Sequence, residues 1–535
     1  MKFHNKAVYR GPHIFSGTPM VCIRLDLEEL ENWPSNKIAG FNEKLLSLLP
    51  SLHEHGCSYG VAGGFAKRLA EGTWLGHVIE HVALELQNIA GSPVSRGKTR
   101  SVRGQPGVYN VLYEYETENM ALCAGRLAVE LVNSLLPEDL QGLTGFEGLY
   151  GDYEGGFTSI AAAVDYVRAI AARERLGPTT RAIALAAKRR GIPVMRLDGE
   201  SLVQLGTGKY RKCIRGSVTD ATSAVAMDTA GDKALTKKLL EESGIPVPRG
   251  SVVSNEEDAL EAALEIGYPV VIKPLDGNQG KGITTGIASE AQLHEAFLFA
   301  KRHSNAIIVE KHYEGRDYRV LVIAGQVTAV AEREAAQVIG DGAHNVSELI
   351  ERLNADPKRG NGHEEVLTKI CLHDQIEKYL AKANKTFASI PAAGEKVRLC
   401  GTANLSTGGT AIDRTDDIHP LNISLMERAA RVIGLDIAGI DVIAEDISKP
   451  ISDLTGAVLE VNASPGFRMH LHPSKGRANP VGEAVVSTLF PAGAPSSVPV
   501  AAITGTNGKS TTGRMVAHIL RQNNYNVGLT STSGV

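Results

Sequence analysis

Two glycine-rich stretches, each preceded by an apolar run, lie far apart in this chain and constrain its fold more than any other feature. Glycines let backbone N–H groups close over phosphates, and a neighbouring lysine neutralises phosphate charge. The sequence therefore predicts a multidomain protein, combining α+β and α/β units, that binds nucleotide at two places. The candidate residues are Lys273, Gly277, Gly280 and Gly282 in the first stretch, and Gly505, Gly508, Lys509 and Ser510 in the second.

Length and composition indicate a large globular protein. The 535 residues correspond to three or four domains of roughly 100–200 residues each. Hydrophobic residues make up 43% and charged residues 22%, and no uncharged stretch of about 18 residues could span a bilayer. Residues 1–6 lack the apolar run of a secretory signal, so we expect a cytoplasmic location.

Cysteines and net charge exclude further classes. The six cysteines include no CxxC pair, which argues against a disulfide framework and against a thiolate zinc site. A net charge of −4 gives no overall attraction to nucleic acid, so neither nucleic acid nor a membrane is an expected partner.

The first predicted domain covers residues 1–160. It mixes a β-like run at 107–115 with helical periodicity at 73–90 and 120–136, which is typical of an α+β domain. A glycine-rich stretch at 142–156 precedes the predicted boundary.

Two further units follow. In residues 161–490, helices alternate with apolar strands, as in α/β folds. A polar, helical insertion at about 340–396 interrupts this pattern, and it is interpreted either as a mobile lid or as a solvated helical decoration. Residues 491–535 begin with a proline-rich linker, and the apolar run at 500–504 is expected to form a strand that leads into the second phosphate loop.

Glu460 and Asn462 are the strongest candidates for a metal site. Residues two apart on a strand point to the same face, so both side-chain oxygens converge. Magnesium prefers hard oxygen ligands, and Asp441 would supply a further carboxylate. The alternative is an exposed strand with two polar residues on one side, and the Ser-Pro-Gly sequence at 464–466 argues against it.

Residues 270–282 and 459–466 together resemble the ATP-grasp ligases, which phosphorylate a carboxylate with ATP and pass the acyl group to an amine. The resemblance implies that Lys233 and Lys273 contact the phosphates, that the segment beginning at Glu310 faces adenine, and that Asp317 holds the ribose. It further implies that Arg319 and Arg398 act in the phosphate or acceptor pocket, and that Ser464 and the loop 404–409 frame it.

The second loop departs from the common Walker pattern because Ile503 stands where that pattern has a glycine. The same departure occurs in the Mur peptide ligases, which residues 505–512 resemble. About two dozen residues follow the loop, too few for the surrounding parallel sheet. We therefore expect a truncated Mur-ligase-like module, from a fragment or a vestigial third domain.

An ATP-grasp unit followed by a Mur-like unit, behind an N-terminal domain of this size, resembles the cyanophycin synthetases. The resemblance implies a ligase with ATP and Mg²⁺ that extends a cyanophycin primer, the ATP-grasp unit adding L-aspartate and the Mur-like unit adding L-arginine to the aspartate side chain. It also implies a homotetramer.

A histidine-rich helix marks the N-terminal domain. His77, Glu80 and His81 form the HxxEH pattern of inverted zinc peptidases. His77, His81 and Glu85 share one helical stripe and could hold Zn²⁺, while Glu80 could act as general base. This favours a metal-dependent hydrolase that makes primers. The alternative is an amphipathic helix whose histidines are hydrogen-bonded at a surface.

Three other functions stay open. A D-alanine or glutathione-type ligase would share the ATP-grasp chemistry, a metallopeptidase could use an ATP-grasp unit only to bind polymer, and an inert scaffold would release no phosphate in response to an amino acid.

Overall fold

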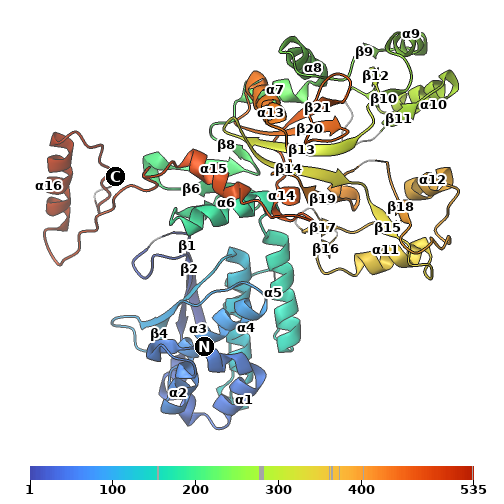
Figure 1. The fold of residues 1–535 in the computed structure, drawn as a ribbon. Helices are drawn as coiled ribbons and strands as arrows, with labels where there is room; N and C mark the ends of the chain where they lie inside the picture. Colours follow the sequence, from blue (N-terminus) through green and yellow to red (C-terminus); the bar gives the residue numbers. More distant parts are fainter. Residues whose placement is uncertain are drawn as a thin grey trace.

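The computed structural model describes residues 1–535 except residues 12, 153–155, 276–281, 361, 363–364, 373, 402, 533 and 535. Figure 1 shows three parts: an N-terminal body, a larger central body, and a C-terminal helix that stands apart from both. Within the described residues, no helix combines the length and apolarity needed to cross a membrane.

The N-terminal body is an antiparallel sheet covered by helices. The strands lie in the order β1-β2-β4-β3. Val21, Ile23 and Leu25 alternate along β2 and are fully buried in the core that α3 and α4 complete. The elements are β1 (Lys2–Tyr9), β2 (Met20–Asp26), α1 (Phe41–Leu48), α2 (Gly64–Glu71), α3 (Leu75–Ile89), β3 (Gly97–Ser101), β4 (Val108–Glu114), α4 (Glu118–Ser134) and α5 (Ile160–Glu174).

Helix α5 belongs to this body although it follows the boundary expected near residue 160. Val164, Val167 and Ile170 are buried in the N-terminal core, and α5 contacts both α3 and α4. The N-terminal body therefore extends to about residue 174 in the structure.

The central body contains three larger sheets. Five strands lie in the order β19-β14-β13-β20-β21, four in the order β11-β10-β12-β9, and four short ones in the order β5-β6-β7-β8. Neighbouring strands in all three are antiparallel.

The strands of the central body are β5 (Val194–Arg196), β6 (Leu202–Leu205), β7 (Lys212–Arg215), β8 (Val218–Thr219), β9 (Gly250–Val253), β10 (Val270–Pro274), β11 (Thr284–Ile287), β12 (Ile307–Lys311), β13 (Arg316–Ile323), β14 (Gln326–Glu334), β19 (Thr410–Asp413), β20 (Ile437–Ala444) and β21 (Gly456–Ala463). The helices are α6 (Pro178–Arg189), α7 (Ala224–Gly231), α8 (Lys233–Glu242), α9 (Glu256–Ile266), α10 (Glu290–Lys301), α13 (Pro420–Ile433), α14 (Arg468–Leu471) and α15 (Val481–Leu489).

The insertion has a hydrophobic core of its own, to which Val346, Ile350, Leu380 and Val397 contribute. The sequence predicts a helical insertion. The structure adds short strands, which form two two-stranded sheets. Its elements are β15 (Gln337–Ile339), α11 (Val346–Asn354), β16 (Arg359–Gly360), β17 (Leu367–Thr368), α12 (Asp374–Lys382) and β18 (Lys396–Arg398), with β15 pairing β18.

The C-terminal part is the helix α16 (Lys509–Gln522), which begins directly after Gly508. The strand expected at residues 500–504 is absent, and these residues are exposed. A strand requires a hydrogen-bonded neighbour, and none of the described strands pairs with this segment.

The two ends of the central body lie side by side, because α6 packs against α15. Gly482 allows the close approach: a Cβ built there would lie 2.5 Å from the carbonyl oxygen of Ala182. Arg190 also donates to the Phe490 carbonyl oxygen at 2.6 Å.

We predict that Gly482→Ala destabilises the central body by about 1–3 kcal/mol, because the new methyl group would force α15 away from α6. Gly231→Ala is the control, since a Cβ there meets no atom within 4 Å. Calorimetric unfolding midpoints measure the difference, and equal midpoints for the two variants would contradict the packing described.

Candidate active site

The five-stranded sheet brings the three predicted metal ligands together. Asp441 on β20 pairs directly with Glu460 on β21. The Asn462 side-chain amide donates to Glu460 Oε1 at 2.9 Å and to Asp441 Oδ2 at 3.5 Å. Strand alternation places Glu460 and Asn462 on one face, as expected, and the β20–β21 register adds Asp441.

Two arginines from neighbouring strands surround Asp441. Arg319 on β13 donates to both carboxylate oxygens, and its Nη2–Oδ2 distance is 3.1 Å. Arg333 on β14 lies 3.3 Å from Asp441 Oδ2. Burial alone would raise the pKa of Asp441, but Arg319 and Arg333 outweigh it and hold this pKa below its usual value.

Asp317, for which the resemblance implies a ribose contact, also lies in this cluster. Arg333 Nε donates to Asp317 Oδ1 at 2.8 Å. Burial raises the pKa of Asp317 to about 6, although the charge of Arg333 opposes the shift. Sequence reasoning missed Arg333, because only the β13–β14 register places it opposite Asp317.

A second charged cluster lies on the sheet β11-β10-β12-β9, around Glu310 on β12. Lys273 Nζ on β10 donates to Glu310 Oε1 at 2.6 Å, and Lys237 Nζ on α8 lies 3.5 Å from Oε2. Glu310 is only 4% exposed, so its side chain serves as the anionic centre between two ammonium groups. Burial lowers the pKa of Lys237, and Glu310 offsets part of the shift.

Lys237 is a lysine of α8 that contacts Glu310, and sequence reasoning did not single it out. Lys233 is the first residue of α8, one helical turn before Lys237. Spacing in the sequence did not distinguish them, since both lie on the same helical face.

The first glycine loop is described only at its end. Gly277 and Gly280 lie outside the described residues. Gly282 has φ +76°, and a Cβ there would lie 2.7 Å from the Pro274 ring. A side chain at residue 282 would therefore clash with the end of β10.

Arg398 lies on β18 of the insertion, whereas Ser464 lies two residues after Asn462. The Arg398 side chain is exposed. Among the described residues, neither a hydrogen bond nor an ion pair joins it to Asp441. Ser464 directly follows β21 and has φ +52°. The acceptor role implied for Arg398 stays a prediction.

His470 on α14 is a buried polar residue that sequence reasoning missed. It is 1% exposed, and neither ring nitrogen has a hydrogen-bond partner among the described residues. Burial, reinforced by Arg319, lowers the pKa of His470 to about 3. The ring is therefore neutral beside the arginines that hold Asp441.

The second phosphate loop closes on itself. Lys509 Nζ donates to the carbonyl oxygens of Gly505 at 2.7 Å and Thr506 at 3.1 Å. Gly508 has φ +79° and precedes α16, whose first turn holds Lys509 and Ser510. These residues lie away from the central body (Figure 1).

The histidine-rich helix α3 forms a possible metal centre with a residue outside the motif. One ligand atom each from Cys57, His77 and His81 lie within 4.8 Å of one another. Cys57 Sγ is 3.4 Å from His77 Nε2, and Thr73 Oγ1 is 2.9 Å from His77 Nδ1. Burial lowers the pKa of His77 to about 4, and neutral imidazole is the form that binds metal.

Glu85, predicted as the third ligand, is not part of this group of ligand atoms in the structure, which has Cys57 there. Its carboxylate is bound by Ser51 and by His55 Nε2, the latter at 2.6 Å. His55 Nδ1 in turn lies 2.9 Å from His81 Nδ1. Ser51 and His55, which precede α2, bind the Glu85 carboxylate. Cys57, from the same region, lies beside His77 and His81.

Glu80 packs against β3, where Thr99 Oγ1 donates to Glu80 Oε2 at 2.6 Å. It is 4% exposed. Burial raises the pKa of Glu80 to about 8, partly offset by the Thr99 hydrogen bond. Glu80 is thus a carboxyl group that burial makes a stronger base than an exposed one.

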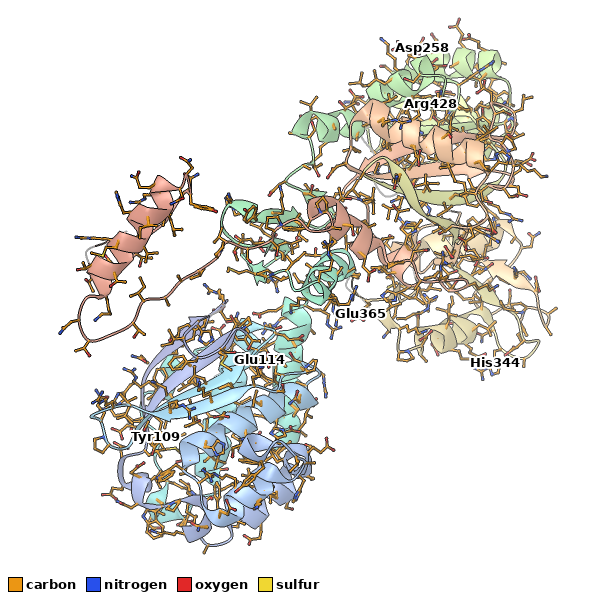
Figure 2. All side chains as sticks on the ribbon, turned by 60° about the vertical axis from the view of Figure 1, so that its left-hand side comes forward. Tyr109, Glu114, Asp258, His344, Glu365 and Arg428 are labelled. Atoms are coloured by element: carbon orange, nitrogen blue, oxygen red, sulfur yellow. The ribbon has the colours of Figure 1, made fainter. Side chains whose placement is uncertain are left out.

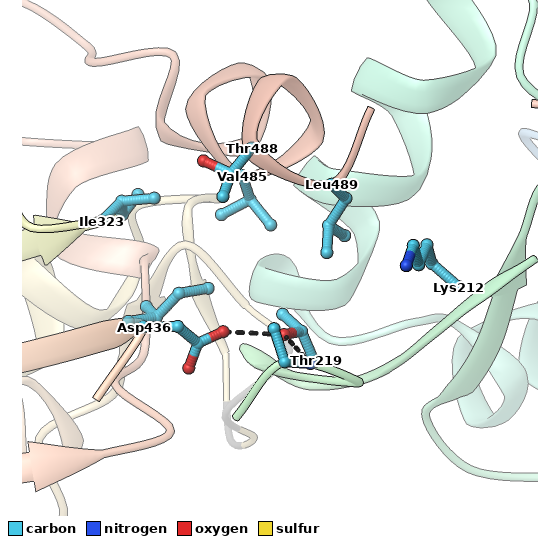
Figure 3. Close-up of a pocket in the computed structure, with 9 residues that line it drawn as sticks. Lys212, Thr219, Ile323, Asp436, Val485, Thr488 and Leu489 are labelled. Atoms are coloured by element: carbon cyan, nitrogen blue, oxygen red, sulfur yellow. Dashed lines mark hydrogen bonds between the residues drawn. The ribbon is translucent and has the colours of Figure 1, made fainter. Parts of the chain in front are cut away.

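A small cavity behind the five-stranded sheet holds none of the predicted residues. It has a volume of about 120 Å³ and is lined mainly by apolar side chains such as Val485 and Leu489. Figure 3 shows its polar wall, where Thr219 Oγ1 donates to Asp436 Oδ2 at 2.7 Å.

The fold and these clusters define an ATP-grasp protein. Residues 232–390 match the family model described as Carbamoyl-phosphate synthase L chain, ATP binding domain. The crystal structure of a bifunctional glutathione synthetase from Pasteurella multocida superposes with a TM-score of 0.50 and 29% identity, over 69% of this chain and 50% of that one.

The resemblance to cyanophycin synthetases is confirmed. The chain is 46% identical to the cyanophycin synthetase of Synechocystis sp. over its whole length and 60% of that protein. It is 47% identical to that of Nostoc sp. over 98% of this chain and 57% of that protein. Residues 22–137 match the family model described as Cyanophycin synthase-like N-terminal domain. The chain thus spans about 60% of the length of these relatives.

We predict that Lys237→Ala raises the KM for ATP about tenfold, because an ammonium group paired with a buried carboxylate contributes roughly 1.5–3 kcal/mol. Lys238→Ala is the matched control, since Lys238 is exposed and its contact with Glu242 is 3.9 Å long. Steady-state kinetics with varied ATP distinguish the two, and an unchanged KM for Lys237→Ala would remove Lys237 from the nucleotide site.

Proposed function

We propose that this chain is an ATP-dependent ligase that phosphorylates the C-terminal carboxylate of an aspartate–arginine polymer and adds L-aspartate to it. The observation that carries the proposal is the pair of charged clusters on adjoining sheets of one ATP-grasp body, with Asp441, Glu460 and Asn462 in one and Lys273 and Glu310 in the other. Similarity to the cyanophycin synthetases supports the choice of polymer and amino acid.

The residues present fit magnesium and ATP. Asp441, Glu460 and Asn462 offer oxygen ligands, which Mg²⁺ prefers. When bound, Mg²⁺ neutralises charge on the phosphates during transfer. Lys273 and Lys237 bring positive charge to the neighbouring sheet, where the ATP phosphates would be held.

The arginines suit the carboxylate that is to be activated. ATP transfers its γ-phosphoryl group to this carboxylate, the amine of aspartate attacks the acyl phosphate, and inorganic phosphate leaves. Arg319 is a bidentate donor to Asp441, and the same planar fork can bind the polymer carboxylate or the departing phosphate. Fixed charges at the transferring group are usually the largest catalytic contribution.

Addition of L-arginine is proposed for the second ATP site, the loop containing Gly505, Gly508, Lys509 and Ser510. Its departure from the Walker pattern at Ile503 and the helix that starts at Lys509 support a Mur-ligase-like module. Assembly into a homotetramer is likewise proposed from the resemblance.

We predict that Lys273→Ala and Glu460→Gln each lower the rate of aspartate addition about 10²–10³-fold without unfolding the protein, because each removes charge at the transferring phosphate. Lys238→Ala is again the control. Retention of more than about half the activity by either variant would show that the first ATP site is misplaced.

Phosphate release tests the proposed substrate directly. The assay contains ATP, Mg²⁺ and a short aspartate–arginine oligomer, and each of the common amino acids is added in turn. We expect release with aspartate. Release with another amino acid would indicate a different peptide ligase, and release independent of any amino acid would favour a polymer-binding scaffold.

A second function is proposed for the N-terminal body: metal-dependent hydrolysis of the same polymer, which would supply new chain ends to extend. The convergence of Cys57, His77 and His81 favours it. Three protein ligands with an open fourth position are typical of catalytic zinc, which supplies an activated water. Glu80 is the proposed general base.

We predict that His81→Ala loses both the bound metal and polymer cleavage, whereas Glu80→Gln keeps the metal and loses cleavage. His53→Ala is the control, because His53 is exposed. Metal analysis and product masses provide the readouts. Wild-type protein prepared without chelators that contains no stoichiometric transition metal would return these histidines to a structural role.

A further inference from the structure

A hollow of about 320 Å³ lies between the segment that follows α5, the central body and the insertion. Its walls come from residues 175–176, from α6, from the end of α14 and the residue after it, from the start of α15, and from residues 365–366 of the insertion. Figure 2 shows Glu365 at this junction. The volume falls within the range of about 300–1,000 Å³ that is typical of sites for small ligands.

Basic groups with no partner line this hollow. Arg175 and Arg181 are exposed, and neither guanidinium group has an ion pair or hydrogen bond among the described residues. Arg189 is already paired with Glu483 at 3.0 Å. Burial lowers the pKa of His472, and the charges of Lys358 and Arg181 add to the shift, which indicates positive potential on this wall.

Glu365 is the acidic residue of the lining whose side chain has no ion pair among the described residues, since Glu483 pairs with Arg189. The backbone of its segment is fixed, because Arg468 Nη1 on α14 donates to the Glu365 carbonyl oxygen at 3.3 Å and to Thr368 Oγ1 at 3.1 Å. The hollow therefore offers two guanidinium groups and one carboxylate.

Helix α6 links the hollow to a segment that leads from the candidate active site. Thr179 on α6 accepts a hydrogen bond of 3.0 Å from the Phe467 backbone N–H. Phe467 ends the short turn that follows β21, the strand that carries Glu460 and Asn462. One face of α6 thus lines the hollow, while its first turn touches the segment leading from the carboxylate cluster.

We propose that this hollow is a subsite for a side chain of the polymer, in which Arg175 and Arg181 bind the carboxylate of one β-linked arginine and Glu365 binds its guanidinium group. The proposal rests on the proposed ligase function and extends it. An aspartate–arginine polymer carries one carboxylate and one guanidinium group in every side chain, and both charges find complements here. Arginine pairs with carboxylates through two parallel hydrogen bonds.

The test compares two primers and three proteins. One primer is an aspartate–arginine oligomer; in the other, every arginine carboxylate except that of the last unit is amidated. The proteins are the wild type, the double variant Arg175→Gln/Arg181→Gln, and Arg431→Gln as control, because Arg431 is exposed on α13. Initial rates give kcat and the KM for primer, ATP and aspartate.

We expect amidation to raise the primer KM about tenfold for the wild type and for Arg431→Gln, and to have no effect on the double variant. The KM for ATP and aspartate and kcat should be unchanged throughout. A double variant that still discriminates between the primers would overturn the subsite, as would a wild type that does not. If no protein ligates aspartate, the ligase proposal fails; calorimetric binding of both primers then decides the subsite by the same pattern.

Discussion

The burial of Asp441 between two guanidinium groups is the interaction on which the central body depends. A carboxylate taken out of water without compensation costs several kcal/mol. Arg319 and Arg333 supply that compensation from two different strands, and Asp317 balances the second positive charge. A register slip of one residue would turn these charges toward the face that buries Val320, Val322 and Val330. Charge pairing and hydrophobic burial therefore specify the same alignment of β13, β14 and β20.

The same compensation limits how the site binds cations. The Asn462 side-chain amide donates to Glu460 and to Asp441, whose own oxygens are also engaged by arginine. A divalent cation bound to Asp441 would compete with the guanidinium groups of Arg319 and Arg333. Once displaced, these two groups could bind an anionic substrate. Such an exchange keeps the net charge of the buried cluster nearly constant as substrates enter, which avoids the larger cost of an unpaired charge. The neutral ring of His470 adds no further positive charge to this region.

The sequence predicted those site features that depend on local geometry. Glu460 and Asn462 share a face because strands alternate, and His77 and His81 share one because helices repeat every 3.6 residues. Lys237 and Arg333 were missed because their roles arise from contacts between elements distant in the chain. The absence of a CxxC pair argued against thiolate ligands, yet Cys57 reaches the α3 histidines from a separate segment. Glu85 was predicted as a metal ligand because it shares a helical stripe with His77 and His81. The stripe does not show that Ser51 and His55 pack opposite Glu85 and bind its carboxylate.

The contact between α6 and α15 has a consequence for how such proteins are assembled. The first and last helices of the central body, α6 and α15, touch each other, so the segments through which the chain enters and leaves this body are in direct contact. A body with adjoining ends can be inserted between other segments without disturbing its interior. The N-terminal body and the second phosphate loop are thus attached through two helices that contact each other, and neither attachment interrupts the sheet that carries Asp441.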